Sequence, residues 1–142
     1  MPLALVDTNI LIYRFDFRFP RKQSIATELL RRGLAEDTVR IPHQAVVEFV
    51  TAVSRPQKES PPILPAEDAR HEAEDLLNQF EVLYPNDAVV RTAIRGAATY
   101  HLAWWDAHLW AYAECYGLGE LLSEDFEHGR FYGTVRTVDP FR

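Results

Sequence analysis

Near its start the chain reads Leu3-Ala4-Leu5-Val6-Asp7-Thr8-Asn9. The four apolar residues form a short unbroken run, which is typical of a β-strand buried on both faces of a parallel sheet. Asp7 ends the run, and the polar residues after it favour the start of a helix over residues 10–15. Parallel α/β sheets form their ligand sites beyond the carboxyl ends of their strands. This opening therefore predicts a carboxylate at the functional edge of an α/β fold.

The rest of the chain repeats this alternation of strand and helix. Further short strands are predicted at residues 39–41, 81–83, 121–122 and 135–138. Helices are predicted between them, by proline and glycine boundaries and by apolar residues three or four apart, at residues 21–32, 42–53, 65–79, 87–102 and 106–116. Strands that alternate with helices pair in parallel, so the sequence predicts a doubly wound α/β sheet. No repeat or linker divides residues 1–142, which predicts a single domain.

Three local predictions rest on particular residues. Gly33 is expected to end the helix that precedes it, because glycine is common just past a helix end. Val90, Ile94 and Ala98 have the spacing of an apolar stripe, so this side of their helix is expected to face the core. Four prolines between residues 56 and 65 predict a loop.

The composition describes a folded protein rather than a membrane or disordered one. Apolar residues make up 47% of the chain, which is enough for a buried core. No apolar stretch is long enough to cross a membrane, and no signal peptide is recognisable, so we expect a soluble protein. The single cysteine, Cys115, excludes an internal disulfide and suits a reducing cytosol. A cytoplasmic location is therefore expected.

The net charge of −6 argues against a protein that coats nucleic acid passively. The charge is uneven, however, because the first forty residues are slightly basic and the remainder is strongly acidic. The basic side chains of the first part are Arg14, Arg18, Arg21, Lys22, Arg31, Arg32 and Arg40. They are interpreted either as a solvated face or as a rim that contacts phosphates beside an acidic pocket.

Four carboxylates are candidates for that pocket. Asp7 and Asp125 follow predicted strands, so both belong at the edge of the sheet where sites form. Asp106 precedes the apolar stripe of its helix and is expected to face the body of the protein, where a carboxylate needs a partner. Glu48 lies beside the apolar stripe of the helix after the second strand.

Each of these carboxylates also has an ordinary structural interpretation. Asp7 and Asp106 could cap helices, Asp125 could be a turn residue, and Glu48 could be a solvated helix residue. Together, however, they form a set of hard oxygen ligands, which suits Mg²⁺ or Mn²⁺ better than zinc. Such an ion can activate water, neutralise a phosphate and stabilise the leaving oxygen, as phosphodiester hydrolysis requires.

Four sequence motifs, in order along the chain, resemble those of PIN-domain proteins, and more narrowly VapC-type toxins of bacterial toxin–antitoxin pairs. They are Leu5-Val6-Asp7-Thr8-Asn9-Ile10-Leu11-Ile12-Tyr13, Val46-Val47-Glu48-Phe49, Trp105-Asp106-Ala107-His108-Leu109-Trp110-Ala111 and Leu121-Leu122-Ser123-Glu124-Asp125-Phe126. The first and third are the more specific, and the resemblance spans nearly the whole chain. Residues 56–65 depart from the pattern, because this loop is longer than the resemblance leads us to expect.

The resemblance implies a three-layer α/β fold with a five-stranded parallel sheet, flanked by helices, in which strands one and four are neighbours. It implies metal ligation by Asp7 and Asp106, with Glu48 and Asp125 completing an acidic pocket. Asn9 and Ser123 match positions that support the pocket by hydrogen bonding. The implied activity is Mg²⁺- or Mn²⁺-dependent cleavage of RNA by an endoribonuclease toxin. A homodimer and inhibition by a cognate antitoxin are also implied.

Other functions fit less well. A haloacid-dehalogenase-like phosphatase needs a second aspartate where Asn9 stands, and a receiver domain needs a late lysine, whereas the lysines are Lys22 and Lys58. A metal-free ribonuclease that uses two histidines stays open, although no spacing singles out a pair. The main alternative is a PIN-like scaffold that binds RNA or a protein without cutting. Three tryptophans could mark a partner surface or pack in the core: Trp104, Trp105 and Trp110.

Overall fold

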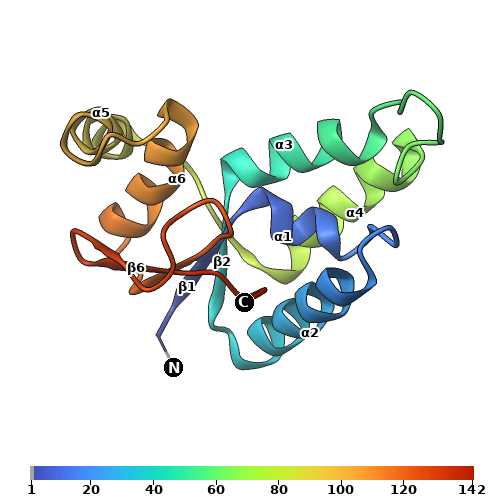
Figure 1. Cartoon of the computed structure of the whole chain (residues 1–142), viewed down its shortest axis with the longest axis horizontal. Coiled ribbons are helices and arrows are strands. Elements are labelled where there is room, and N and C mark those ends of the chain that lie inside the picture. Colours follow the sequence, from blue (N-terminus) through green and yellow to red (C-terminus); the bar gives the residue numbers. More distant parts are fainter. Residues whose placement is uncertain (1) are drawn as a thin grey trace.

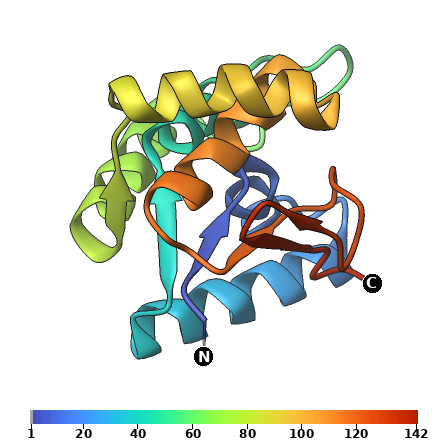
Figure 2. The ribbon, with the colours of Figure 1, turned by 90° about the vertical axis from the view of Figure 1, so that its left-hand side faces the viewer.

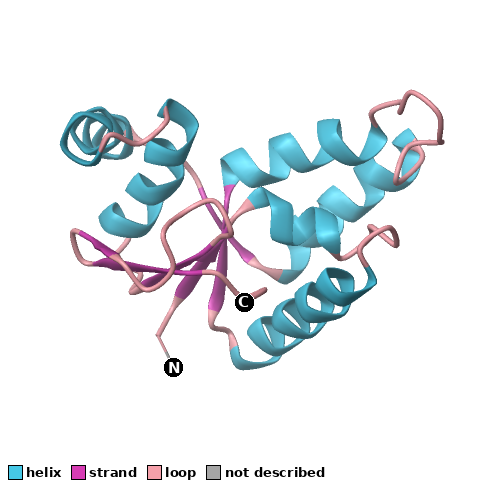
Figure 3. Ribbon diagram, viewed as in Figure 1, coloured by secondary structure: helices cyan, strands magenta, loops and turns pink. Residues whose placement is uncertain are grey.

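A computed structural model describes residues 2–142 and contains a six-stranded sheet with helices on both faces (Figures 1 and 3). The strands are β1 (Ala4–Val6), β2 (Val39–Pro42), β3 (Glu81–Leu83), β4 (Glu120–Leu122), β5 (Phe131–Tyr132) and β6 (Val135–Val138). Their order across the sheet is β3-β2-β1-β4-β6-β5. The three-layer α/β architecture predicted from the sequence is confirmed.

Strand β1 lies in the middle of the sheet and pairs in parallel with both β2 and β4. In the second pairing Leu5 is opposite Leu121 and Val6 is opposite Leu122. The expected contact between strands one and four is thus present. Because parallel strands end at the same edge, the residues after Val6 and Leu122 emerge side by side.

The expected number of strands is wrong by one. The five predicted strands are all present and parallel, but β5 adds a sixth that is antiparallel to β6. A two-residue turn at Gly133 and Thr134 joins β5 to β6, and Gly133 has a φ of 61°, which glycine adopts without strain. The Thr134 N–H and hydroxyl both donate to Glu114. A strand of only two residues is too short to show a period in the sequence.

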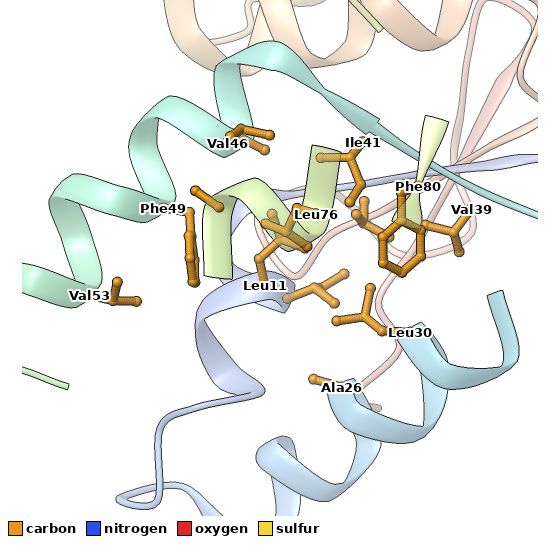
Figure 4. Close-up of a cluster of buried hydrophobic side chains, with 14 of the residues drawn as sticks. Leu11, Ala26, Leu30, Val39, Ile41, Val46, Phe49, Val53, Leu76 and Phe80 are labelled. Atoms are coloured by element: carbon orange, nitrogen blue, oxygen red, sulfur yellow. The ribbon is translucent and has the colours of Figure 1, made fainter. Parts of the chain in front are cut away.

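Two groups of helices cover the two faces of the sheet (Figures 1 and 2). One face carries α1 (Thr8–Tyr13), α2 (Pro20–Glu36), α3 (His43–Ser54) and α4 (Ala66–Gln79), and the other carries α5 (Asp87–Tyr100) and α6 (Trp104–Cys115). On the first face Phe49, Leu11 and Leu30 are fully or almost fully buried between the helices and Ile41 of the sheet (Figure 4). This packing fixes α1 and α3 against the sheet beside the end of β1.

Helix α2 is longer than predicted and passes through Gly33. It ends at Glu36, where Asp37 takes the left-handed conformation and donates its N–H to the carbonyls of Gly33 and Leu34. A Cβ on Gly33 would lie 2.2 Å from Cγ2 of Val39. Gly33 is therefore a close-packing residue between α2 and β2, not a helix stop.

The predicted apolar stripe of α5 faces outward, which is a second correction. Val90 and Ile94 are 40% and 54% exposed, and Ala98 is also exposed. The buried face consists instead of Val89, Ala93 and Gly96. The small residues Ala93 and Gly96 on this face allow α5 to pack closely on α6.

The proline-rich loop is confirmed. Residues 55–65 contain no helix or strand, and they separate α3 from α4. The end of the loop is fixed against the protein, because the N–H of Leu64 donates to the carbonyl of Val53 at 2.9 Å and Ile63 packs on the core. Among residues 2–142, no helix is both long enough and apolar enough to cross a membrane.

Candidate active site

A cleft of about 440 Å³ opens beyond the carboxyl end of β1, with walls from α1, α3 and α6. All four carboxylates identified in the sequence line it: Asp7, Glu48, Asp106 and Asp125. Each comes from a different segment, namely the end of β1, helix α3, helix α6 and the loop after β4. Folding thus brings into one cleft four acids that are far apart in the sequence.

Asp7 is the most buried of the four, with an exposed fraction of 8%. Its N–H donates to the carbonyl of Leu122, so the pairing of β1 with β4 positions its backbone. The hydroxyl of Ser123, which is fully buried, donates to Oδ2 of Asp7 at 2.6 Å. Asp7 stands at the N-cap position of α1 but makes no capping bond. Its carboxylate therefore belongs to the cleft and is not a helix cap.

The surroundings of Asp7 disfavour its charged form. Burial, and to a smaller extent the negative charges of Asp125 and Asp106, raise the pKa of Asp7 from 3.8 to about 6. The hydrogen bond from Ser123 acts in the opposite direction and limits the rise. Near neutral pH the carboxylate is thus ionised at a cost, which a bound cation would offset.

Asp106 lies in the first turn of α6 without capping it. The N-cap position is Ala103, and no side chain caps this helix. Leu109 and Trp110, one turn further on, are buried, which confirms that this side of the helix faces the protein body. Burial raises the pKa of Asp106, and the negative charges of Asp125 and Glu48 add to the effect.

Helix α1 holds the two remaining carboxylates through adjacent residues. The hydroxyl of Thr8 donates to Oε2 of Glu48 at 2.7 Å. The amide of Asn9 donates to Oδ2 of Asp125 at 3.3 Å. Ser123 links the two sides, because its Oγ also accepts the N–H of Asp125. Asn9 and Ser123 therefore make the kind of contacts expected of them, although their part in activity remains a prediction.

The chemistry of this donor set fits a hard divalent cation. The cleft offers carboxylate and hydroxyl oxygens, which Mg²⁺ and Mn²⁺ prefer. Within residues 2–142, no three His, Cys, Asp or Glu side chains are gathered as a group that could hold an ion by itself. Mg²⁺ commonly binds through one or two carboxylates and keeps several waters, so a partly hydrated ion suits this arrangement.

Four polar residues of the cleft were missed by the sequence reasoning: Thr8, Gln44, Thr51 and Arg55. Three of them share with Glu48 the side of α3 that faces the cleft. Their positions four residues before, three after and seven after Glu48 fall on one side of a helix. This spacing was the signal that could have found them, once Glu48 was taken as a site residue.

The basic residues of the first forty do not form a rim around the cleft. Five of the seven are ion-paired within the chain, including Lys22, whose Nζ is 2.7 Å from Glu124, and Arg18, 2.8 Å from Asp16. Across the described part of the chain, none of the seven lines the cleft. The basic side chain that does line it is Arg55.

The three tryptophans have different surroundings. Trp110 is 4% exposed, and its indole N–H donates to the carbonyl of Tyr132 at 2.9 Å, so it is a core residue. Trp104 and Trp105 are 47% and 64% exposed. Of these two, Trp105 lines the cleft, whereas Trp104 packs edge-on against His108.

Comparison with known families gives one match, in which the model of the PIN domain fits residues 4–133. A comparison with curated proteins finds no match. Among solved structures, the chain is similar to a toxin–antitoxin complex from Klebsiella pneumoniae. The identity is 20% and the TM-score 0.67, with 96% of this chain and 97% of that chain covered.

Two further solved structures have the same fold. DNA-bound VapBC from Salmonella typhimurium is 15% identical, with a TM-score of 0.70 and 99% of each chain covered. VapC20 of Mycobacterium tuberculosis, described as a toxin that cleaves the sarcin–ricin loop, is 14% identical. Its TM-score is 0.60, with 86% of this chain and 89% of that chain covered. At these identities the likeness establishes a common architecture.

Proposed function

This chain belongs to the PIN domain family, and from that premise we propose that it is a metal-dependent endoribonuclease that acts as the toxin of a toxin–antitoxin pair. The observation that carries the proposal is the convergence of four carboxylates from distant segments on one open cleft. An acidic cleft of this kind repels a polyanion unless a cation neutralises it. Metal-assisted hydrolysis of a phosphodiester accounts for both the acids and the cation.

In this proposal Asp7 and Asp106 hold Mg²⁺ or Mn²⁺, because burial and mutual repulsion make these two the acids that gain most from a cation. When bound, the ion would activate a water and neutralise the phosphate. Ser123 keeps Asp7 in place through its 2.6 Å bond. Oε2 of Glu48 is engaged by Thr8, so Oε1 is the atom suited to accept a proton from the attacking water.

Purified protein incubated with total RNA tests this proposal. Cleavage should occur with Mg²⁺ or Mn²⁺ and stop with EDTA. Asp7→Asn should lose at least ~3 kcal/mol of transition-state stabilisation, which is roughly a hundredfold in rate. Glu74→Gln, which removes an exposed acid of α4, is the matched control and should cut like the wild type. Near-normal cleavage by Asp7→Asn, or a wild type that is inactive in both metals, contradicts the proposal.

A scaffold that binds RNA without cutting is the second candidate. The presence of all four acids in one cleft speaks against it, because a scaffold has no need for them. The cleavage experiment separates the two candidates, because a scaffold would bind RNA equally well in EDTA and leave it intact.

We further propose an antitoxin partner and a homodimer. The Klebsiella pneumoniae structure is a toxin–antitoxin complex, which supports a protein partner of the same kind here. The dimer is supported by the outward face of α5, where Val90 and Ile94 expose apolar surface. Expression of the chain alone should arrest growth, and co-expression of its genomic neighbour should relieve the arrest. Unaffected growth with no co-purified partner would exclude the toxin role.

A further inference from the structure

The cleft contains two side chains that metal binding does not explain. Trp105 lines it with 64% of its surface exposed, and Val47, which also lines it, is 53% exposed. Arg55 also lines it, as the basic residue among acids. An ion needs neither an apolar wall nor a second cation. A nucleotide needs both, because it has an apolar base face and an anionic phosphate.

Trp105 and Arg55 stand at the two ends of one side of α3. At the first end, the side-chain amide of Gln44 donates to the backbone carbonyl of Trp105 at 3.3 Å, which joins the starts of α3 and α6. Further along the side of α3 that faces the cleft lie Glu48 and Thr51. Arg55 lies at the far end, directly after the last residue of the helix. Gln44 and Arg55 are eleven positions apart, which is ~16 Å along a helix.

Arg55 is not neutralised by the acids with which it shares the cleft. Of the ion pairs formed by the described residues, none involves Arg55, whereas half of the other arginines have a carboxylate partner. Its side chain is exposed. A guanidinium with this placement can bind a phosphate by two parallel hydrogen bonds.

We propose that Trp105 and Arg55 hold an RNA strand at opposite ends of the cleft, with a nucleobase stacked on the indole and a phosphate bound by the guanidinium. This inference rests on the proposed function and assigns to it two positioning residues. The scissile phosphate then lies between them, at the carboxylates. The span corresponds to about five nucleotides at ~3.4 Å each in a stacked strand, and to fewer in an extended one.

The arrangement selects unpaired RNA. Stacking on Trp105 requires a base whose face is open, and a paired base inside a duplex keeps its faces covered by its neighbours. Arg55, in contrast, binds the backbone and carries no preference for sequence. The two residues therefore make separate contributions, one to the recognition of an unpaired base and one to the placement of the backbone.

The test measures binding and cleavage of a ten-nucleotide RNA by the full chain, with Ca²⁺ in the binding assays to prevent cutting. Trp105→Ala should weaken binding about tenfold, and Trp105→Phe should recover most of it. Arg55→Ala should weaken binding and lower the slope of log affinity against log salt by about one, and Arg55→Lys should restore the slope. In cleavage, both alanine variants should raise KM more than they lower kcat.

Two matched controls are available in the chain. Trp104→Ala removes the adjacent exposed indole, which does not line the cleft, and Arg95→Ala removes an exposed arginine of α5. Both should bind like the wild type. In addition, an abasic nucleotide at the stacked position should weaken binding to the wild type but have no further effect on Trp105→Ala, since both changes remove the same contact.

Equal binding of Trp105→Ala and Trp104→Ala, or an unchanged salt slope in Arg55→Ala, would overturn the inference. So would loss of binding to the co-expressed partner protein with RNA binding intact, because these residues would then belong to a protein interface. Failure of the proposed function has a different result, in which the wild type binds RNA and shows the effects above but does not cut in Mg²⁺ or Mn²⁺.

Discussion

At the scale of single residues, Asp7 links the stability of the protein to pH. Its pKa is raised from 3.8 to about 6 in the fold, so the folded state holds a proton that the unfolded state has released. The stabilisation of the folded state that comes from this protonated carboxyl is fully present below about pH 4, and it is lost as the pH rises through 6. This shift corresponds to roughly 3 kcal/mol. In EDTA, the free energy of unfolding should therefore decrease between about pH 4 and pH 7, as urea titrations can measure.

Asp7→Asn is the comparison for that prediction, because it removes the titrating group and should flatten the profile. Under the proposed function Mn²⁺ should reverse the trend in the wild type, since it would bind the ionised acids of the folded state. At a hundred times its dissociation constant it adds ~2.7 kcal/mol. A wild-type profile that rises with pH in EDTA would contradict the assignment of the raised pKa to Asp7.

Asp106 allows a separation of metal binding from helix stabilisation. Because its pKa is raised by burial and by neighbouring acids, Asp106→Asn should raise the melting temperature in EDTA at pH 7.5 and remove most of the gain from Mn²⁺. Asp68→Asn is the control, because Asp68 also lies in the first turn of a helix but is exposed on α4. It should lower stability slightly and leave the Mn²⁺ effect unchanged. If Asp106→Asn instead lowers the melting temperature in EDTA and keeps the full gain from Mn²⁺, Asp106 is an ordinary helix carboxylate and not a metal ligand.

At the scale of elements, the contact between α5 and α6 depends on Gly96. A Cβ at this position would lie 2.3 Å from Cζ3 of Trp110, in the rigid ring of a buried residue. Gly96→Ala should therefore destabilise the protein by about 1–3 kcal/mol, against the usual gain of about 0.5–1 kcal/mol for alanine in a helix. Urea unfolding of this variant should be compared with that of Gly119→Ala, where the nearest atom would be 3.5 Å away. A stabilised Gly96→Ala would show that α6 can move away.

The same helix shows why the buried face of α5 was not predictable from hydrophobicity alone. Its sequence offers two possible inner faces, and the larger side chains, Val90 and Ile94, mark the face that remains exposed. The fold buries Ala93 and Gly96 instead, because the bulky ring of Trp110 occupies the space between the helices. Gly33 was misinterpreted for a related reason, since its close contact with Val39 is formed only in the folded protein.

At the scale of the whole molecule, the exposed face of α5 predicts self-association. Sedimentation of the purified chain should show a dimer, and Ile94→Glu should shift it towards a monomer by placing a charge in the apolar contact. Leu77→Glu is the control, because Leu77 is similarly exposed, at 46%, but lies on α4. Equal behaviour of the two variants would exclude α5 as the dimer contact.

How much of the site was predictable depended on how each residue is positioned. Asp7 and Asp125 follow from a general rule, because parallel strands end at the same edge of a sheet. Glu48 and Asp106 lie on helices whose placement depends on tertiary packing, and only the family motifs placed them in the same pocket. Arg55 belongs to no motif, and its position became visible only when the length of α3 was known.

The 2.6 Å bond between Ser123 and Asp7 joins residues 116 positions apart, across the central strands β1 and β4. A ribosome synthesises the chain from its N-terminus, so Asp7 is made early. Its partner Ser123 is made only after most of the polypeptide has been synthesised. Folding that requires such distant contacts is slow compared with folding through local ones. The acidic cleft is therefore assembled only once synthesis is nearly complete, and the chain being translated carries no finished four-carboxylate site beside the messenger RNA that encodes it.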